Sequence, residues 1–145
     1  MKKRIYILIV VALLLLIIVA INTLNRPERS IKTFVLNNEY DLKTICDSYL
    51  NNDTSIKTFK NVEVDGLFKG EHDIVQFFYS GFGIAPATKY YGFYYSEDDE
   101  PAAFQNINIT LVEKGKNEWE WSDGTDNGGI TIRIKENWFY YEAWF

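Results

Sequence analysis

The chain has 145 residues, 47% of them hydrophobic and 17% aromatic, which is enough apolar material for one domain with its own core. From Arg26 onward, 12 Lys and Arg stand against 20 Asp and Glu, a net charge of −8. Such an acidic surface is repelled by phosphate backbones, which argues against nucleic acid as a partner. The single cysteine, Cys46, excludes an intrachain disulfide.

The first element is an uninterrupted apolar run, residues 5–21, that follows a basic cluster at residues 1–4. Its length reaches the lower end of what crosses the hydrocarbon core of a membrane as a helix. It contains no charge, proline or glycine, so helical hydrogen bonds can satisfy its backbone. We therefore predict a transmembrane anchor from Ile5 through Leu13 to Ile21, with the lipid bilayer as a partner. A cleaved secretory signal is the alternative, although its apolar region usually spans only about 7–15 residues.

Basic residues on either side of this run predict its orientation. The cluster at residues 1–4 lies directly against the run, whereas Arg26, Arg29 and Lys32 lie several residues beyond its end. This asymmetry predicts a single-pass protein of the cell membrane with a cytoplasmic N-terminus and an extracytoplasmic C-terminal domain. The predicted organisation is a cytoplasmic N-terminus at 1–4, an anchor at 5–21, a linker at 22–30 and an exported domain at 31–145.

The next two segments are a linker and a helix. Residues 22–30 are polar, and Pro27 among them is expected to stop a helix from continuing. An amphipathic helix is predicted over residues 37–52, with Asn38 as its N-cap. Its apolar residues follow the i, i+3, i+4, i+7, i+8 spacing of one buried stripe. The stripe consists of Leu42, Ile45, Cys46, Tyr49 and Leu50.

Beyond the helix the apolar pattern changes to period two, with turn clusters such as DG at 65, SGFG at 80 and EDDEP at 97. No helical pattern separates the apolar stretches, so neighbouring strands are expected to pair antiparallel. The predicted fold is α+β: an N-terminal transmembrane helix, then one amphipathic helix packed on an antiparallel sheet of about five to seven strands. The predicted strands are 61–64, 74–79, 89–95, 106–113, 118–122, 130–135 and 138–145.

The predicted strand 89–95 carries aromatic side chains on both faces. Tyr91 and Tyr95 lie on one face, and Tyr90 and Tyr94 lie on the other. The last strand repeats this pattern, so the two strands could pair through a ladder of aromatic rings. One interpretation is that all these rings are core; the other is a partly exposed platform that binds a polypeptide or the apolar face of a cell-wall sugar. The candidate ligand-binding residues are Tyr90, Tyr91, Tyr94, Tyr95, Trp138 and Tyr140.

The only histidine, His72, is the candidate for acid–base catalysis, because its side chain titrates near neutrality. Adjacent strand residues point to opposite faces, so neither Glu71 nor Asp73 is placed to orient the ring. The sequence shows no nucleophile elbow, second histidine or paired metal ligand beside it. A surface histidine is the simpler interpretation. A small membrane-tethered hydrolase that uses His72 and a nearby carboxylate is the alternative.

The segment DGTDNGG partly resembles a calcium-binding loop, with Asp123, Asp126 and Asn127 as weak candidate ligands. Ile134 stands at the twelfth position, where such a loop needs a bidentate Glu, and strands rather than helices are predicted on either side. A glycine-rich hairpin turn is the favoured interpretation. The acids at 97–100 are likewise interpreted as a solvated loop, and neither a cofactor nor a metal is expected.

These features favour a membrane-anchored protein whose acidic, aromatic-rich extracytoplasmic domain is a non-catalytic binding module. Two alternatives stay open: the hydrolase, and a structural subunit whose aromatic face packs permanently against a membrane complex. The observation that separates them is which aromatic rings are exposed.

Overall fold

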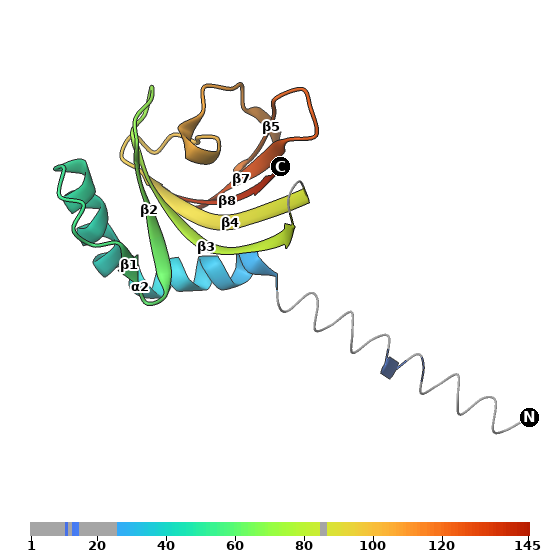
Figure 1. The fold of residues 1–145 in the computed structure, drawn as a ribbon, viewed down its shortest axis with the longest axis horizontal. Helices are drawn as coiled ribbons and strands as arrows, with labels where there is room; N and C mark the ends of the chain where they lie inside the picture. Colours follow the sequence, from blue (N-terminus) through green and yellow to red (C-terminus); the bar gives the residue numbers. More distant parts are fainter. Residues whose placement is uncertain (1–10, 12, 15–25, 85–86) are drawn as a thin grey trace, which may run out of the picture.

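The computed structural model describes residues 11, 13–14, 26–84 and 87–145 of the chain. In this part, one long helix packs on a single antiparallel sheet of eight strands (Figure 1). The predicted α+β class is confirmed, but the predicted number of strands, five to seven, is too low. The elements are α2 (Pro27–Leu50), β1 (Thr58–Phe59), β2 (Val62–Phe68), β3 (Ile74–Ile84), β4 (Ala87–Ser96), the 3-10 helix η1 (Phe104–Asn106), β5 (Val112–Gly115), β6 (Glu118–Ser122), β7 (Gly128–Lys135) and β8 (Trp138–Trp144).

The strand order across the sheet is β1-β2-β3-β4-β8-β7-β6-β5. The last strand returns to the middle of the sheet, where β8 pairs with β4 and places Tyr140 opposite Phe93 and Phe139 opposite Tyr94. The two aromatic strands are therefore neighbours, and cross-strand ring pairs join the two halves of the sheet.

The predicted transmembrane anchor, residues 5–21, lies outside the described residues except for three helical positions, one of which is Leu13. Residues 1–4 and 22–25 also lie outside them. Among the helices that the structure does describe, none is both long enough and apolar enough to cross a membrane.

Helix α2 begins earlier than predicted, at Pro27, so the last four residues of the predicted linker are helical. Proline is tolerated at the first helical position because the N–H that it lacks has no partner inside the helix there. Asn38, the predicted N-cap, instead has φ −126° and ψ 15° and marks a kink, where its Nδ2 donates to the Phe34 carbonyl at 2.7 Å. The sequence pattern detected the second part of the helix and missed the first, whose Ile31 and Val35 are fully buried.

The predicted turn at SGFG lies inside strand β3, because β3 and β4 stay paired as far as Ile84 opposite Ala87. Gly81 and Gly83 therefore lie in the paired strands of the hairpin and not in a turn. Gly83 has φ +115°, and a Cβ at this position would lie 2.1 Å from the Ala87 carbonyl oxygen. A residue with a side chain is therefore strained at position 83.

The predicted strand 106–113 is mostly irregular, and only its last two residues belong to β5. The amide Nδ2 of Asn106 donates to the carbonyls of Phe68 and His72 at 3.1 and 2.9 Å. These bonds hold the segment across one face of the sheet, so it does not join the sheet as a strand.

Both faces of the sheet are covered, which explains why the aromatic strands carry rings on both sides. Helix α2 covers one face and packs there on a core that includes Phe77, Phe93 and Trp138. The chain between β4 and β5, with η1, covers the opposite face and packs on Tyr94 and Phe139.

The end of the β3–β4 hairpin at which Ile84 pairs with Ala87 lies where α2 begins. The rings of Phe34 and Phe93 are 5.9 Å apart, and the Lys43 Nζ lies 5.0 Å from the ring centroid of Tyr95. Because the later residue of α2 contacts the later residue of β4, the helix and the strand run in the same direction. The end of β3 and the start of β4 share one end of the domain with the start of α2, on the right of Figure 1, which we call the helix-start end.

Candidate functional site

Most of the predicted aromatic platform is core. The Tyr94 ring stacks on Phe139 with centroids 5.1 Å apart and is only 1% exposed. Its hydroxyl accepts a hydrogen bond from the Ala102 N–H at 2.7 Å, and its burial raises the pKa of the phenol. This burial favours the core interpretation over an open platform for four of the six candidates. Those four are Tyr94, Tyr95, Trp138 and Tyr140.

The other two candidates, Tyr90 and Tyr91, are half-buried and lie on opposite faces of β4. Tyr91 packs on the core beneath α2. Tyr90 stacks on Phe104 with centroids 5.9 Å apart and meets Phe78 and Phe145 edge to face at 6.2 and 5.9 Å. The cover over this face of the sheet ends beside Tyr90, so its ring borders open space.

A cleft of about 470 Å³ occupies that space, and we call it the aromatic cleft. One side of it is polar and consists of Asp65 and Gln105. Gln76, which is buried behind them, donates from Nε2 to the Asp65 carboxylate at 2.7 Å and accepts the Gln105 N–H at Oε1 at 2.8 Å. Partial removal from water raises the pKa of the Asp65 carboxyl, and the hydrogen bond from Gln76 opposes that shift. The lining residues are Asp65, Phe78, Tyr90, Phe104, Gln105 and Phe145.

A wider hollow of about 1010 Å³ opens at the helix-start end, and we call it the tip hollow. Beside it, Phe82 and Ile84 project from the β3–β4 hairpin and are 79% and 87% exposed. A turn was predicted for this segment from the sequence, and the exposed pair Phe82 and Ile84 was missed. The alternation of glycine with Phe and Ile at positions 81–84 was the feature of the sequence that could have indicated this pair. The lining residues are Phe82, Ala87, Thr88, Lys89, Thr125, Asp126, Asn127, Trp144 and Phe145.

In the loop that resembles a calcium site, polar groups of the loop itself occupy the Asp123 carboxylate through hydrogen bonds. The Asp123 carboxylate accepts hydrogen bonds from the Thr125 N–H at 2.9 Å, the Thr125 hydroxyl at 2.6 Å and the Asn127 amide at 2.9 Å. These bonds lower the pKa of the Asp123 carboxyl. The candidate Asp126 lies on the wall of the tip hollow. In the described part of the chain, no three His, Cys, Asp or Glu side chains are placed to hold a metal ion.

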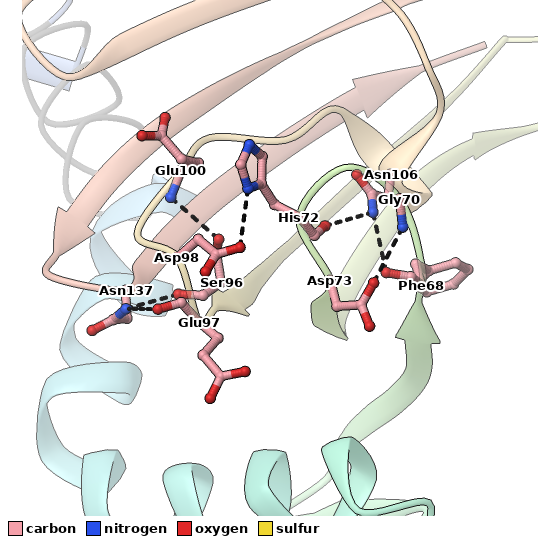
Figure 2. A network of polar contacts seen from close by, with 10 residues as sticks. All are labelled: Phe68, Gly70, His72, Asp73, Ser96, Glu97, Asp98, Glu100, Asn106 and Asn137. Carbon is pink, nitrogen blue, oxygen red and sulfur yellow. Dashed lines mark hydrogen bonds and ion pairs between the residues drawn. The ribbon is translucent and has the colours of Figure 1, made fainter.

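His72 meets a carboxylate that is distant in the sequence (Figure 2). Its Nδ1 lies 3.0 Å from Oδ2 of Asp98, and this contact raises the pKa of the imidazole. The partner is therefore neither Glu71 nor Asp73, the two acids that the sequence places next to it. A cleft of about 440 Å³ adjoins the pair, and its lining residues include Glu100 but no Ser, Thr or Cys. The arrangement can orient an imidazole, and the lining adds the carboxylates of Glu71 and Glu100 and the amine of Lys69, but no hydroxyl or thiol.

The acids at 97–100 are held by the protein and are more than a solvated loop. The Arg133 guanidinium pairs with the Asp99 carboxylate, which also accepts the Asn137 N–H at 2.6 Å. The Asn137 amide donates to the Glu97 carbonyl at 3.0 Å (Figure 2). These contacts fix the start of the segment that covers the face opposite α2.

Comparison with known proteins finds no matching family model, no matching curated protein and no matching solved structure. The function therefore has to follow from the aromatic cleft, the tip hollow and the His72–Asp98 pair.

Proposed function

We propose that the protein is held in a membrane by residues 5–21 and that its α+β domain binds a ligand on the extracytoplasmic side without catalysing a reaction. The proposed binding site is the aromatic cleft, and the proposed ligand is a neutral cell-wall glycan, with a polypeptide as the alternative. The observation that carries this proposal is the half-buried Tyr90 ring beside the Asp65 carboxylate and Gln105.

Support for the anchor and its orientation comes from the sequence. Residues 5–21 form an apolar run of membrane-spanning length, and the basic cluster at 1–4 lies directly before it. The domain that follows carries an excess of acids and an aromatic-rich core, which is compatible with a folded module outside the bilayer.

The chemistry of the aromatic cleft supports a sugar ligand. The apolar face of a sugar ring packs on an aromatic ring, while its hydroxyls need hydrogen-bond partners. Tyr90 and Phe104 supply the rings, and Asp65 and Gln105 supply a carboxylate and an amide on the same cleft. The acidic surface of the domain disfavours strongly anionic glycans, which is why the proposed ligand is neutral.

Tyr90→Ala tests this proposal, with Tyr91→Ala as the matched control on the opposite face of the same strand. The full chain in lipid nanodiscs is titrated by calorimetry with neutral N-acetylated oligosaccharides from cell wall. An interface aromatic contributes about 2 kcal/mol or more, so the Kd should rise roughly 30-fold in Tyr90→Ala. Tyr91→Ala should keep the affinity of the unaltered chain, provided that circular dichroism shows it folded.

Equal loss of affinity in both variants would contradict the aromatic cleft as the site. If a library of unstructured peptides binds in a Tyr90-dependent way and the oligosaccharides do not, the polypeptide alternative replaces the glycan. Absence of binding to both classes would contradict a binding module.

The His72–Asp98 contact supports the hydrolase as a second candidate. A carboxylate at Nδ1 orients an imidazole so that Nε2 can act as a general base toward water. Hydrolysis of the same oligosaccharides that is abolished by His72→Gln and retained in Glu71→Gln would establish this activity. We expect no hydrolysis from the unaltered chain or from either variant, because the His72–Asp98 pair is exposed to bulk water and is not enclosed in a site that excludes it.

A further inference from the structure

We propose that the end of strand β3, which carries Phe82 and Ile84 and which we call the tip, rests in the headgroup region of the membrane to which the chain is anchored. Phe82 and Ile84 make the contact, with Trp144 beside them in the wall of the tip hollow. This inference rests on the proposed anchor at residues 5–21. It assigns a lipid surface to the tip hollow, whereas the proposed glycan site is the aromatic cleft.

The tip presents apolar side chains that the domain leaves uncovered. Phe82 and Ile84 are almost fully exposed, and the glycines beside them, Gly81 and Gly83, have no side chains that could shield them. Exposed apolar groups clustered in this way mark an interaction surface. The tip therefore contacts something other than water.

The surroundings of the tip match a membrane interface. Trp144 is half-buried in the wall of the tip hollow, and the Lys89 Nζ lies 5.7 Å from its ring centroid. Tryptophan is enriched where a protein crosses from water to lipid, because its ring is apolar and its N–H is polar. Lysine can extend its ammonium group from such a surface toward lipid headgroups.

The tip also lies at the end of the domain that the anchor must approach. Helix α2 begins at Pro27, and only residues 22–26 separate it from the predicted anchor. Five residues reach at most about 18 Å when fully extended, so the start of α2 stays close to the bilayer. The β3–β4 hairpin shares this end of the domain with the start of α2 (Figure 1).

Charge at the helix-start end is complementary to anionic lipids. Arg26, Arg29 and Lys32 are exposed along the first turns of α2, and Glu28 is the only acid among residues 26–32. The segment from Arg26 onward is otherwise acidic, with its net charge of −8. Basic residues next to a membrane span attract anionic headgroups, so this end of the domain is the one suited to face the bilayer.

Two features limit the contact to headgroup depth. Strand β2 pairs with β3 only as far as Phe78, whereas β4 pairs with it as far as Ile84, so in the described part of the chain the outer edge of the tip has no neighbouring strand. Unpaired backbone groups are not tolerated in hydrocarbon, but headgroups and water can satisfy them. Asp126 in the wall of the tip hollow also has to stay in water.

The test places a fluorophore at the tip of the full chain, reconstituted in vesicles of phosphatidylcholine and phosphatidylglycerol. Ile84→Cys carries the dye at the tip. Ile56→Cys is the matched control, because Ile56 is also an exposed isoleucine but lies near the opposite end of α2. Its carbonyl accepts a hydrogen bond there from the hydroxyl of Tyr49. Cys46 is retained because it is buried and its burial raises the pKa of the thiol, so the chain without substitutions controls for stray labelling. A nitrobenzoxadiazole dye is quenched by nitroxide lipids from the membrane and by iodide from water.

We expect the dye at position 84 to lose most of its emission to nitroxide lipids and little to iodide, with the reverse at position 56. Equally weak lipid quenching at both positions, in a chain that alkaline washing leaves in the vesicles, would overturn the tip contact and leave the anchor intact. Shielding of position 84 from iodide without lipid quenching would assign the free strand edge to a second copy or a polypeptide, which also overturns the proposal. Release of the chain by alkaline washing would contradict the anchor and this inference with it.

Discussion

Tyr90 and Tyr94 project from the same face of strand β4 into different environments. Tyr94 is closed in beneath Ala102 and Ala103, whereas the Tyr90 ring borders the aromatic cleft. The covering segment closes over Tyr94, whereas at Tyr90 it contributes the stacked ring of Phe104 and leaves part of the tyrosine ring open to the cleft. One face of one strand is therefore core at one end and candidate binding surface at the other.

This difference predicts different costs for the same substitution. Tyr94→Ser should lower the free energy of unfolding by about 3–5 kcal/mol, because it removes a fully buried ring from a stacked pair. Tyr90→Ser should cost much less, since its ring already contacts water. Urea denaturation of the full chain in detergent, followed by tryptophan fluorescence, measures both. Equal costs would show that Tyr90 is also core.

Gly92 predicts a second pair of outcomes. A Cβ at this position would lie 2.1 Å from the Phe77 carbonyl oxygen and 2.5 Å from the Tyr141 hydroxyl. Gly92→Ala should therefore destabilise the domain by about 1–3 kcal/mol, the usual cost of overpacking, and toward the upper end because the clash is with backbone. The control is Gly115→Ala, where the nearest atom is 4.0 Å away. A Gly92→Ala variant as stable as the control would contradict the close approach of β3 and β8 to β4.

The sequence pattern predicted those elements whose signal is local. The stripe through Leu42, Ile45 and Tyr49 gave the second part of α2, and strand β6 was predicted with the bounds that it has, Glu118–Ser122. In both cases spacing along the chain decides the structure, since one buried face sets the period. The start of α2 at Pro27 was missed because the local rule for proline was read as a stop rather than as a first turn.

The site was harder to predict, because contacts between distant residues build it. The partner of His72 is 26 residues away in the chain, and nothing in the acidic run distinguishes Asp98 from its neighbours. The cover over Tyr94 comes from an irregular segment that has no periodic pattern of its own. Only the path of that segment decides which tyrosine is open, and hydrogen bonds such as those of Asn106 fix the path.

Asn106 should therefore be more important than its place in a loop suggests. Asn106→Ala removes two hydrogen bonds to backbone carbonyls, and leaving these partly buried carbonyls unsatisfied should cost about 1–3 kcal/mol. Amide hydrogen exchange should rise in residues 69–73, which the side chain ties down. Asn108→Ala, at an exposed position of the same segment, serves as the control. Unchanged exchange in Asn106→Ala would contradict this role.

The His72–Asp98 contact predicts a pH dependence. The hydrogen bond that His72 Nδ1 donates to the Asp98 carboxylate raises the pKa of His72 in the folded state above its unfolded value of about 6.5. The stability that the pair contributes should be fully present below pH ~6.5 and should fade as the pH rises through the higher folded pKa. The effect is small because the pair is exposed. Proton NMR titration of the imidazole should show the raised pKa, and Asp98→Asn should lower it; a pKa unaffected by Asp98→Asn would contradict the contact.

Both proposals require residues 5–21 to hold the domain at a membrane, and the glycan proposal also requires the domain to lie on the extracytoplasmic face. Protease added to intact spheroplasts that express the full chain, with one epitope at each terminus, tests these requirements most directly. We predict that the C-terminal epitope disappears without lysis, while the N-terminal epitope survives on a short membrane-bound fragment. A C-terminal epitope that is protected until the cells are lysed would contradict the extracytoplasmic location.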